Sequence, residues 1–332
     1  ASLYQEERPE DPHSHLLTGD LLLESGDMDA ARERYEEAAL LQDPPMTPTL
    51  KLALLAIRQG EWAHARELLG EARALSASPQ HAISILQVES LLELRLGRID
   101  RTIELTGQQV ENQRQILSPV EQVFSYNIPL IQYNILLDRL DIAQTILVEG
   151  QQAVQPPLDQ FLSFSEAMLN AHLGKFDKAR EALQKGAQAI EHFKADYLAF
   201  QVPLAEAEIA AEMGDYARAA ELLAETLEKA DRSVLGMGLE HQKSILYGAR
   251  AQYHVEAGEL EKAQRVLDVA FRRDDAEPLL WVARAMLQHA NGTPHMALAS
   301  INYALAIWAD ADPAYTEYQE ALALRESLVA GG

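Results

Sequence analysis

Small and large apolar residues recur along this 332-residue chain at fixed distances from a short turn-like phrase. The phrase is a Gly, often an acidic residue, often a bulky apolar residue, and then Ala five positions after the Gly, as in Gly214-Asp215-Tyr216 with Ala219. We call the Gly, or the residue in its place, the anchor of each copy. The eight anchors are Gly26, Gly60, Gly97, Asp138, Gly174, Gly214, Gly258 and Gly292, so their spacings are 34, 37, 41, 36, 40, 44 and 34 residues.

The positions around the anchors predict a tight turn between two closely packed helices. The residue seven positions before the anchor is small in seven of eight copies, and the residue nine positions after it is large and apolar or aromatic in seven of eight. Gly adopts the left-handed backbone that ends a helix without steric cost, and Asp tolerates it, which explains Asp138. The pattern therefore predicts eight helical hairpins. An amphipathic last helix from Ala314 to about Val329 brings the expected total to seventeen helices.

This pattern resembles the tetratricopeptide repeat family over roughly residues 12–310. The best copy reads Tyr247, Ala251, Gly258, Leu260, Ala263, Leu267 and Ala270, and the last copy matches it except that Pro294 stands where the bulky turn residue belongs. The resemblance implies an all-α fold, a right-handed superhelical solenoid of about eight hairpins with a C-terminal capping helix. Only two spacings keep the family's period of 34 residues, which makes this an elongated, irregular array of bacterial type.

The uneven spacing suggests a division of the chain into segments. We expect a leader over residues 1–11, the repeat array over 12–310, and a capping helix with a tail over 311–332. A joint near residues 109–119 could split the array into sub-arrays 12–115 and 116–310. The last helix either covers the apolar face of the final repeat or packs on a further segment of a longer protein. Because the chain starts with Ala1 rather than Met, the second interpretation stays open.

Charge narrows the range of partners. With 28 Lys and Arg against 51 Asp and Glu, the net charge of −23 repels nucleic acid phosphates and anionic lipids. We therefore expect no nucleic acid partner. The longest apolar stretch, residues 125–137, is too short to insert into a membrane. The acidity either keeps a surface-rich molecule soluble or attracts a basic partner, and it fits the cytoplasm and the periplasm equally well.

The sequence carries no pattern typical of catalysis or of a cofactor. The chain has no cysteine, which excludes disulfides, thiolate catalysis and cysteine-bound metal. Its ten histidines lack metal-ligand spacing, and no phosphate-binding loop, G-x-S-x-G or H-E-x-x-H motif is present. We expect a protein that is not an enzyme and that holds neither metal nor cofactor.

The family resemblance implies that the first helix of each hairpin lines a concave face. The residues ten and six positions before the anchors would lie there, and with Phe161 they give the expected partner-binding set: Leu50, Leu54, Gln87, Leu91, Ile128, Gln132, Phe161, Phe164, Met168, Leu204, Glu208 and Gln252. Phe161, Phe164 and Met168 form the best single hot spot. These apolar residues either fill a tightly wound core or line a groove for a peptide. The Lys, Asn and Arg with which one family branch grips C-terminal carboxylates are missing.

Two hypotheses about function follow from the resemblance. The first is a non-catalytic interaction scaffold that binds a partner polypeptide in or around the superhelical groove, as part of a larger bacterial assembly or a longer chain. The alternative is a regulatory domain of a signalling or transcription protein that senses a peptide or a small molecule. The sequence leaves the oligomeric state open.

Overall fold

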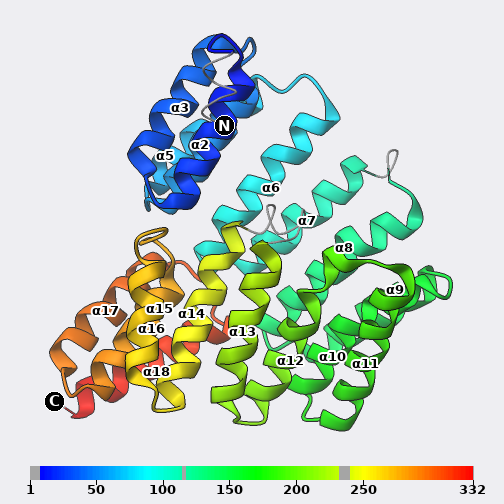
Figure 1. The fold of residues 1–332 in the computed structure, drawn as a ribbon, viewed down its shortest axis with the longest axis vertical. Coiled ribbons are helices and arrows are strands. Elements are labelled where there is room, and N and C mark those ends of the chain that lie inside the picture. Colours follow the sequence, from blue (N-terminus) through cyan, green and yellow to red (C-terminus); the bar gives the residue numbers. More distant parts are fainter. Residues whose placement is uncertain (1–7, 114–116, 232–239, 332) are drawn as a thin grey trace.

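The computed structural model describes residues 8–113, 117–231 and 240–331, and within these ranges it contains α-helices, two 3-10 helices and no strands (Figure 1). Sixteen of the α-helices pair into eight hairpins: α2 (Pro12–Ser25) with α3 (Met28–Leu41), α4 (Met46–Arg58) with α5 (Trp62–Ala74), α6 (Pro79–Arg95) with α7 (Ile99–Gln113), α8 (Pro119–Leu136) with α9 (Leu140–Ala153), α10 (Ser163–His172) with α11 (Phe176–Phe193), α12 (Gln201–Glu212) with α13 (Tyr216–Asp231), α14 (Glu240–Glu256) with α15 (Leu260–Ala270), and α16 (Pro278–Ala290) with α17 (Pro294–Ile307). A final helix, α18 (Thr316–Gly331), follows. The all-α solenoid of eight hairpins and a last helix is confirmed.

The anchors form the turns within the hairpins. All eight have positive φ, from 53° at Asp138 to 89° at Gly26. At Gly214 the left-handed residue lets its own N–H reach the carbonyl of Ala211 at 2.9 Å and the N–H of Asp215 reach the carbonyl of Ala210 at 2.8 Å. These bonds satisfy carbonyls that the end of a helix would otherwise leave unpaired. The chain can therefore reverse direction directly into the next helix.

Where the spacing between two anchors exceeds 34 residues, extra residues form an irregular connection before the first helix of the next hairpin. In the sixth hairpin, 3-10 helix η2 (Asp196–Leu198) precedes α12, which places Pro203 in the first turn of that helix. In the fifth, η1 (Leu158–Leu162) precedes α10. Residues 114–116, within the expected joint at 109–119, lie outside the described residues, as do residues 232–239 and most of the expected leader, residues 1–7. None of the described helices is long and apolar enough to cross a membrane.

Small residues let the helices of a hairpin approach closely. Ala53, Ala167, Ala207, Ala251 and Ala285, each seven positions before an anchor, are fully buried. Gly186 on α11 serves the same purpose, because a Cβ there would lie only 2.9 Å from Cζ of Phe164 on α10. The ring of Phe164 fills the space that Gly186 leaves, so it belongs to the core of its hairpin.

The array turns back so that its last hairpins contact the third one. Trp308, directly after α17, donates from its indole Nε1 to the carbonyl of Arg95 at 3.1 Å, and the backbone N–H of Asp312 donates to the carbonyl of Gly97 at 2.9 Å. Trp308 and Tyr315 share an apolar cluster with Ile99 of α7. We call the contacts of residues 93–100 with residues 274–277 and 308–312 the closing junction. It explains why the hairpins of α15 to α17 lie beside the N-terminal hairpins in Figure 1.

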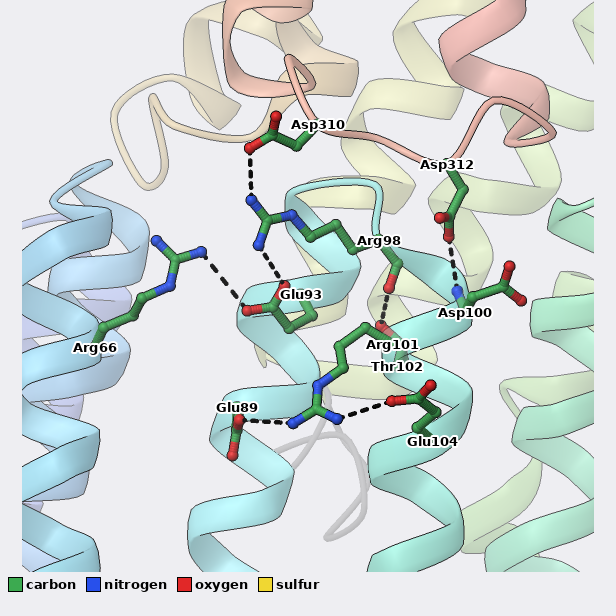
Figure 2. Close-up of polar contacts among 10 residues, drawn as sticks. All are labelled: Arg66, Glu89, Glu93, Arg98, Asp100, Arg101, Thr102, Glu104, Asp310 and Asp312. Carbon is green, nitrogen blue, oxygen red and sulfur yellow. Dashed lines mark hydrogen bonds and ion pairs between the residues drawn. The ribbon is translucent and has the colours of Figure 1, made fainter.

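Polar side chains also join the two sides of the closing junction (Figure 2). The guanidinium of Arg98 joins the third hairpin to the segment after α17, with Nη1 at 3.3 Å from Glu93 and Nη2 at 2.8 Å from Asp310. The N–H of Asp100, in the first turn of α7, donates to Oδ2 of Asp312 at 2.7 Å. Since Asp310 is 76% exposed, its pair with Arg98 contributes little to stability. The buried groups therefore hold the junction together.

Candidate functional site

The two rows of residues expected on the concave face differ in exposure. All eight residues six positions before an anchor are half-buried, which leaves part of each side chain accessible. The row ten positions before contains several core residues instead, with Leu50 8% and Phe164 5% exposed. The structure thus corrects the expectation for Phe164 and Leu50, because both pack into their own hairpins. We leave them out of the candidate binding surface.

The apolar side chain of the second hairpin takes part in packing. Leu54 packs on the buried cluster that contains Ala53 and Leu92, and Ile307 of α17 packs on the same cluster. We therefore leave Leu54 out of the candidate binding surface. In the third hairpin, Gln87 is exposed and Leu91 is half-buried.

The remaining apolar residues of the predicted set lie in hairpins four to six and are half-buried. Phe161 makes an edge-on contact with Phe124, with 6.2 Å between ring centroids, and a tilted contact with Phe193 at 5.5 Å. Ile128 packs on the core of α8 and α9, and Leu204 packs on the core of α12 and α13. These side chains contribute mainly to packing between neighbouring hairpins and present only an edge to solvent.

A continuous row of accessible side chains remains on four consecutive first helices. We call Gln132 of α8, Met168 of α10, Glu208 of α12 and Gln252 of α14 the inner row; each is half-buried and lies six positions before its anchor. Side chains four residues further on occupy the same face of a helix. These are Leu136, His172, Glu212 and Glu256.

Helix α18 begins against this face. The hydroxyl of Thr316, its first residue, donates to the carbonyl of Leu136 at the end of α8, with 2.9 Å between the atoms. The charge of Glu317 raises the pKa of His172 on α10, and the charges of Glu212 on α12 and Glu256 on α14 raise the pKa of Glu320. We call the side of these four first helices that faces α18 the inner side.

Charged groups from four helices meet there, and we call them the inner cluster: His172, Glu208, Glu212, Glu256, Glu317 and Glu320. His172 contacts both carboxylates of α12, with Nδ1 at 2.9 Å from Glu212 and Nε2 at 3.9 Å from Glu208. Burial alone lowers the pKa of His172, but the bond to Glu212 and the charge of Glu208 outweigh it and raise the pKa above its usual value. The hydrogen bond from His172 lowers the pKa of Glu212. These two residues form an ion pair.

Three other carboxyls of the inner cluster, those of Glu208, Glu317 and Glu320, have raised pKa values. Burial raises the pKa of Glu317 to about 8, and the charges of Glu320 and Glu208 add to the effect. Burial also raises the pKa of Glu208, as well as that of Glu320, where Glu212 and Glu256 contribute. Tyr253 of α14 is enclosed among these carboxylates, and burial keeps the pKa of its hydroxyl well above the usual value. Carboxyl groups are thus concentrated on the inner side, and their raised pKa values favour the protonated form.

Sequence reasoning found part of this arrangement and missed the rest. It named Gln132, Met168, Glu208 and Gln252, which the structure brings onto one face. It missed His172, Glu212 and Glu256, which the helical repeat of 3.6 residues could have added, because each lies four residues beyond an inner-row residue. The approach of Glu317 and Glu320 has no local signal in the sequence. Within the described ranges, no group of three or more His, Asp or Glu residues is arranged to hold a metal ion.

Comparison with known proteins identifies the repeat. The sequence profile described as tetratricopeptide repeat matches residues 2–47, which include the first hairpin. No curated protein matches the chain in sequence. Solved structures with a similar fold cover nearly all of it. One is a Rap protein complexed with Competence and Sporulation Factor, with a TM-score of 0.50 and 10% identity over 96% of this chain and 96% of that one.

Two further structures are similar at lower TM-scores. A tetratricopeptide repeat protein from Parabacteroides merdae is 15% identical with a TM-score of 0.41, and the match covers 96% of this chain and 98% of that one. The TPR2AB domain of yeast Sti1, solved in a complex with pHSP90, is 15% identical with a TM-score of 0.30 over 96% of this chain and 98% of that one. At 10% identity, the similarity to the Rap protein establishes a fold and no function.

Proposed function

We propose that this chain, a tetratricopeptide repeat protein by its fold, is a non-catalytic scaffold that binds a segment of a partner polypeptide along the inner row. One observation carries the proposal. Four consecutive first helices each present a half-buried side chain at the same repeat position, while the neighbouring row ten positions before the anchor includes core residues such as Phe164. A row of aligned, accessible positions suits a segment that crosses several helices.

The chemistry of the inner row suits a polypeptide. Gln132 and Gln252 carry amides that can both donate and accept hydrogen bonds, and the thioether of Met168 adapts to apolar side chains of different shapes. The Nε2 of Gln252 is buried and has no acceptor among the described residues. A buried donor without a partner costs free energy, and a backbone carbonyl of a bound segment would remove that cost.

The packing of the second hairpin limits where such a segment would bind. Its Leu54 packs on a buried cluster on which Ile307 of α17 also packs. The inner row of hairpins four to seven presents polar and apolar groups on four consecutive first helices. We therefore assign the partner site to these hairpins.

A sensing role is the second candidate, and the closing junction is the observation that favours it. A ligand changes a conformational equilibrium only when it binds one state better than the other. The junction defines a closed state, because it joins the third hairpin to the last ones through contacts such as Trp308 with Arg95. The Rap protein of similar fold, which was solved with Competence and Sporulation Factor, gives a precedent for a ligand on such an array.

Blocking the inner row tests the scaffold proposal. We would immobilise the chain, incubate it with an extract of its source cells, and compare what it retains with what the Gln132→Trp/Gln252→Trp variant retains. The added indoles fill the space above the row, so the variant should lose the partner while its helix content stays unchanged. A matched variant, Met296→Trp, changes a 54% exposed side chain on α17, outside the inner row, and should retain the partner.

Two results would count against the scaffold proposal. If the Gln132→Trp/Gln252→Trp variant retains the same protein with equal affinity, the inner row is not the contact surface. If Met296→Trp abolishes retention while the inner-row variant keeps it, the partner binds on the side of the second helices instead.

A further inference from the structure

Two carboxyl groups and one guanidinium are buried together inside the closing junction. They belong to Asp274, Glu277 and Arg95, and none of the three side chains is more than 4% exposed. We propose that Glu277 makes the closing junction a pH-sensitive switch: the junction is closed while Glu277 carries a proton and opens more readily once Glu277 is ionised. Binding a partner along the inner row does not require such control, so the proposal goes beyond the scaffold function.

The positive charge of Arg95 is already balanced by Asp274 alone. The Nη1 and Nη2 of Arg95 each donate to one carboxylate oxygen of Asp274 at 2.8 Å, which is the bidentate geometry of a complete ion pair. The same carboxylate also accepts from the backbone N–H of Ala276 at 3.3 Å. A charge on Glu277 would therefore be an additional negative charge without a positive charge of its own.

The carboxyl of Glu277 also lacks a hydrogen bond. Its Oε1 accepts from the backbone N–H of Leu279 at 3.3 Å, where it caps α16. Its Oε2 lies 3.2 Å from Nε of Arg95, but this buried oxygen accepts no hydrogen bond within the described part of the chain. An ionised carboxylate there has lost its water without gaining an aligned donor, which costs free energy. A proton on Glu277 removes the charge and that cost.

The groups around Glu277 come from both sides of the junction. Arg95 lies on α6, Asp274 lies in the connection before α16, and Tyr315 lies between α17 and α18. Burial keeps the pKa of the Tyr315 hydroxyl well above its usual value, so this group stays neutral. Burial also raises the pKa of Glu277 to about 7, although the charge of Arg95 opposes the rise, and the charge of Asp274 adds to it. Both findings agree with the count of charges in the contacts.

The junction can open while the hairpins stay folded. In a solenoid each hairpin is stabilised by its neighbours, whereas the junction joins hairpins that are distant in sequence. Opening would return Glu277 to water, where its pKa takes the usual value of 4.5. The closed form therefore binds more protons than the open form between these two pKa values. A rise in pH across this window favours opening, and a further rise above about pH 7 adds little.

Hydrogen exchange at one amide reports the opening. The backbone N–H of Asp312 donates across the junction to the carbonyl of Gly97 at 2.9 Å, and Figure 2 shows Asp312 beside the start of α7. This amide exchanges when the junction opens. We would measure its exchange by NMR in the full chain with Glu317→Gln, so that this second carboxyl with a raised pKa does not titrate. Corrected for the intrinsic exchange rate, the protection of Asp312 should fall about tenfold between about pH 6 and about pH 8.

Matched variants assign the effect to Glu277. Glu277→Gln keeps the size of the side chain, and Glu277→Ser keeps a capping oxygen for α16, while both remove the carboxyl. The protection of Asp312 should then vary little with pH in either variant. The control Glu33→Gln removes an exposed carboxyl of α3 and should keep the tenfold fall. The N–H of Glu61, which bonds within the second hairpin, is the internal reference and should keep constant protection.

Two results would overturn the proposal. One is a protection of the Asp312 amide that does not change with pH in the chain that retains Glu277. The other is a tenfold fall that persists in both Glu277→Gln and Glu277→Ser. Neither result bears on partner retention by the inner row, so the scaffold function is tested separately.

Discussion

The guanidinium of Arg95 in α6 pairs with both carboxylate oxygens of Asp274, at 2.8 Å each, although 179 residues separate the two in sequence. Both side chains are at most 2% exposed. The Nε of Arg95 also lies 3.2 Å from Glu277, the N-cap residue of α16. In a repeat protein each unit normally contacts only its neighbours. This pair instead joins the third hairpin to the last ones, so it should stabilise the closed form of the whole array.

Removing one partner of this pair should destabilise the protein strongly. Asp274→Ala leaves the guanidinium of Arg95 buried with only Glu277 beside it. We expect the free energy of unfolding to fall by about 3 kcal/mol or more, the usual cost of breaking a buried pair. Denaturant unfolding followed by circular dichroism measures it. Arg180→Ala, which breaks an exposed pair with Asp177, is the control and should change stability by about 0.5 kcal/mol at most.

A double variant measures the interaction between Arg95 and Asp274 separately from the effect of changing each residue alone. Arg95→Met/Asp274→Ala should cost less than the sum of the two single changes, because neither charge is then left alone. Additive costs would mean that the two residues do not depend on each other, contrary to the contact that we describe.

The turn at Gly97 should be less tolerant than other anchors. Its φ is 72°, and a Cβ there would lie 2.7 Å from Cβ of Ala311 and 3.1 Å from the indole of Trp308. Gly174 has φ of 67° and nothing near its missing side chain. Gly174→Ala should cost about 1–2 kcal/mol from the left-handed backbone alone. Gly97→Ala should cost distinctly more, as thermal unfolding of both variants would show. Equal costs would argue against a tight closing junction at this turn.

The raised pKa of the Glu317 carboxyl makes the stability of the protein depend on pH. Its folded pKa of about 8 lies above the usual value of 4.5, so the folded state binds more protons than the unfolded state between these pH values. This carboxyl therefore lowers the free energy of unfolding as the pH rises from about 4.5 to about 8, by at most about 1.4 kcal/mol per pH unit. Glu317→Gln should gain stability over the unaltered chain across that window. A constant difference between the two proteins at all pH values would contradict the assignment.

Phe164 and Met168 should respond differently to truncation, although they are one helical turn apart. Phe164 packs on Gly186 in the core, so Phe164→Ala should cost about 3–5 kcal/mol. Met168 is half-buried on the inner row, so Met168→Ala should cost clearly less and act mainly on partner retention. Unfolding and retention measured on the same two variants separate the roles. A larger loss of stability for Met168→Ala than for Phe164→Ala would reverse our assignment.

The hairpins could be predicted from local sequence patterns. The turn requires a left-handed residue, and both Gly214 and Asp138 have the predicted backbone because the sequence near them contains all the determinants of the turn. Exposure within a helix was harder to predict. Phe164 occupies a position expected on the concave face. Its ring lies in the core instead, because Gly186, twenty-two residues later, has no side chain and leaves space for it. Such a choice depends on how two helices pack, which the repeat pattern of one helix does not contain.

The contact between the last hairpins and the third hairpin could not be predicted from the sequence. Arg95, Asp274 and Trp308 occur in three different hairpins or their connections, and nothing near them signals that they meet. The curvature of a solenoid adds up from small rotations at each interface between repeats. A repeat pattern identifies those interfaces without fixing the rotations. The inner cluster depends on the same return, because the charge of Glu317 acts on His172 only when α18 lies near the earlier hairpins.

Photo-crosslinking tests the central claim, that a partner polypeptide binds along the inner row, most directly. A benzophenone amino acid would replace Gln132 or Gln252 on the inner row and, as the outer set, Met296 or Tyr303 on α17, which are 54% and 47% exposed. Each chain would be irradiated in an extract of its source cells and the crosslinked peptides sequenced. We predict that both inner positions capture the same segment of one protein, which an excess of the unaltered chain displaces, and that the outer positions do not. Capture of that protein at the outer positions alone would contradict the account.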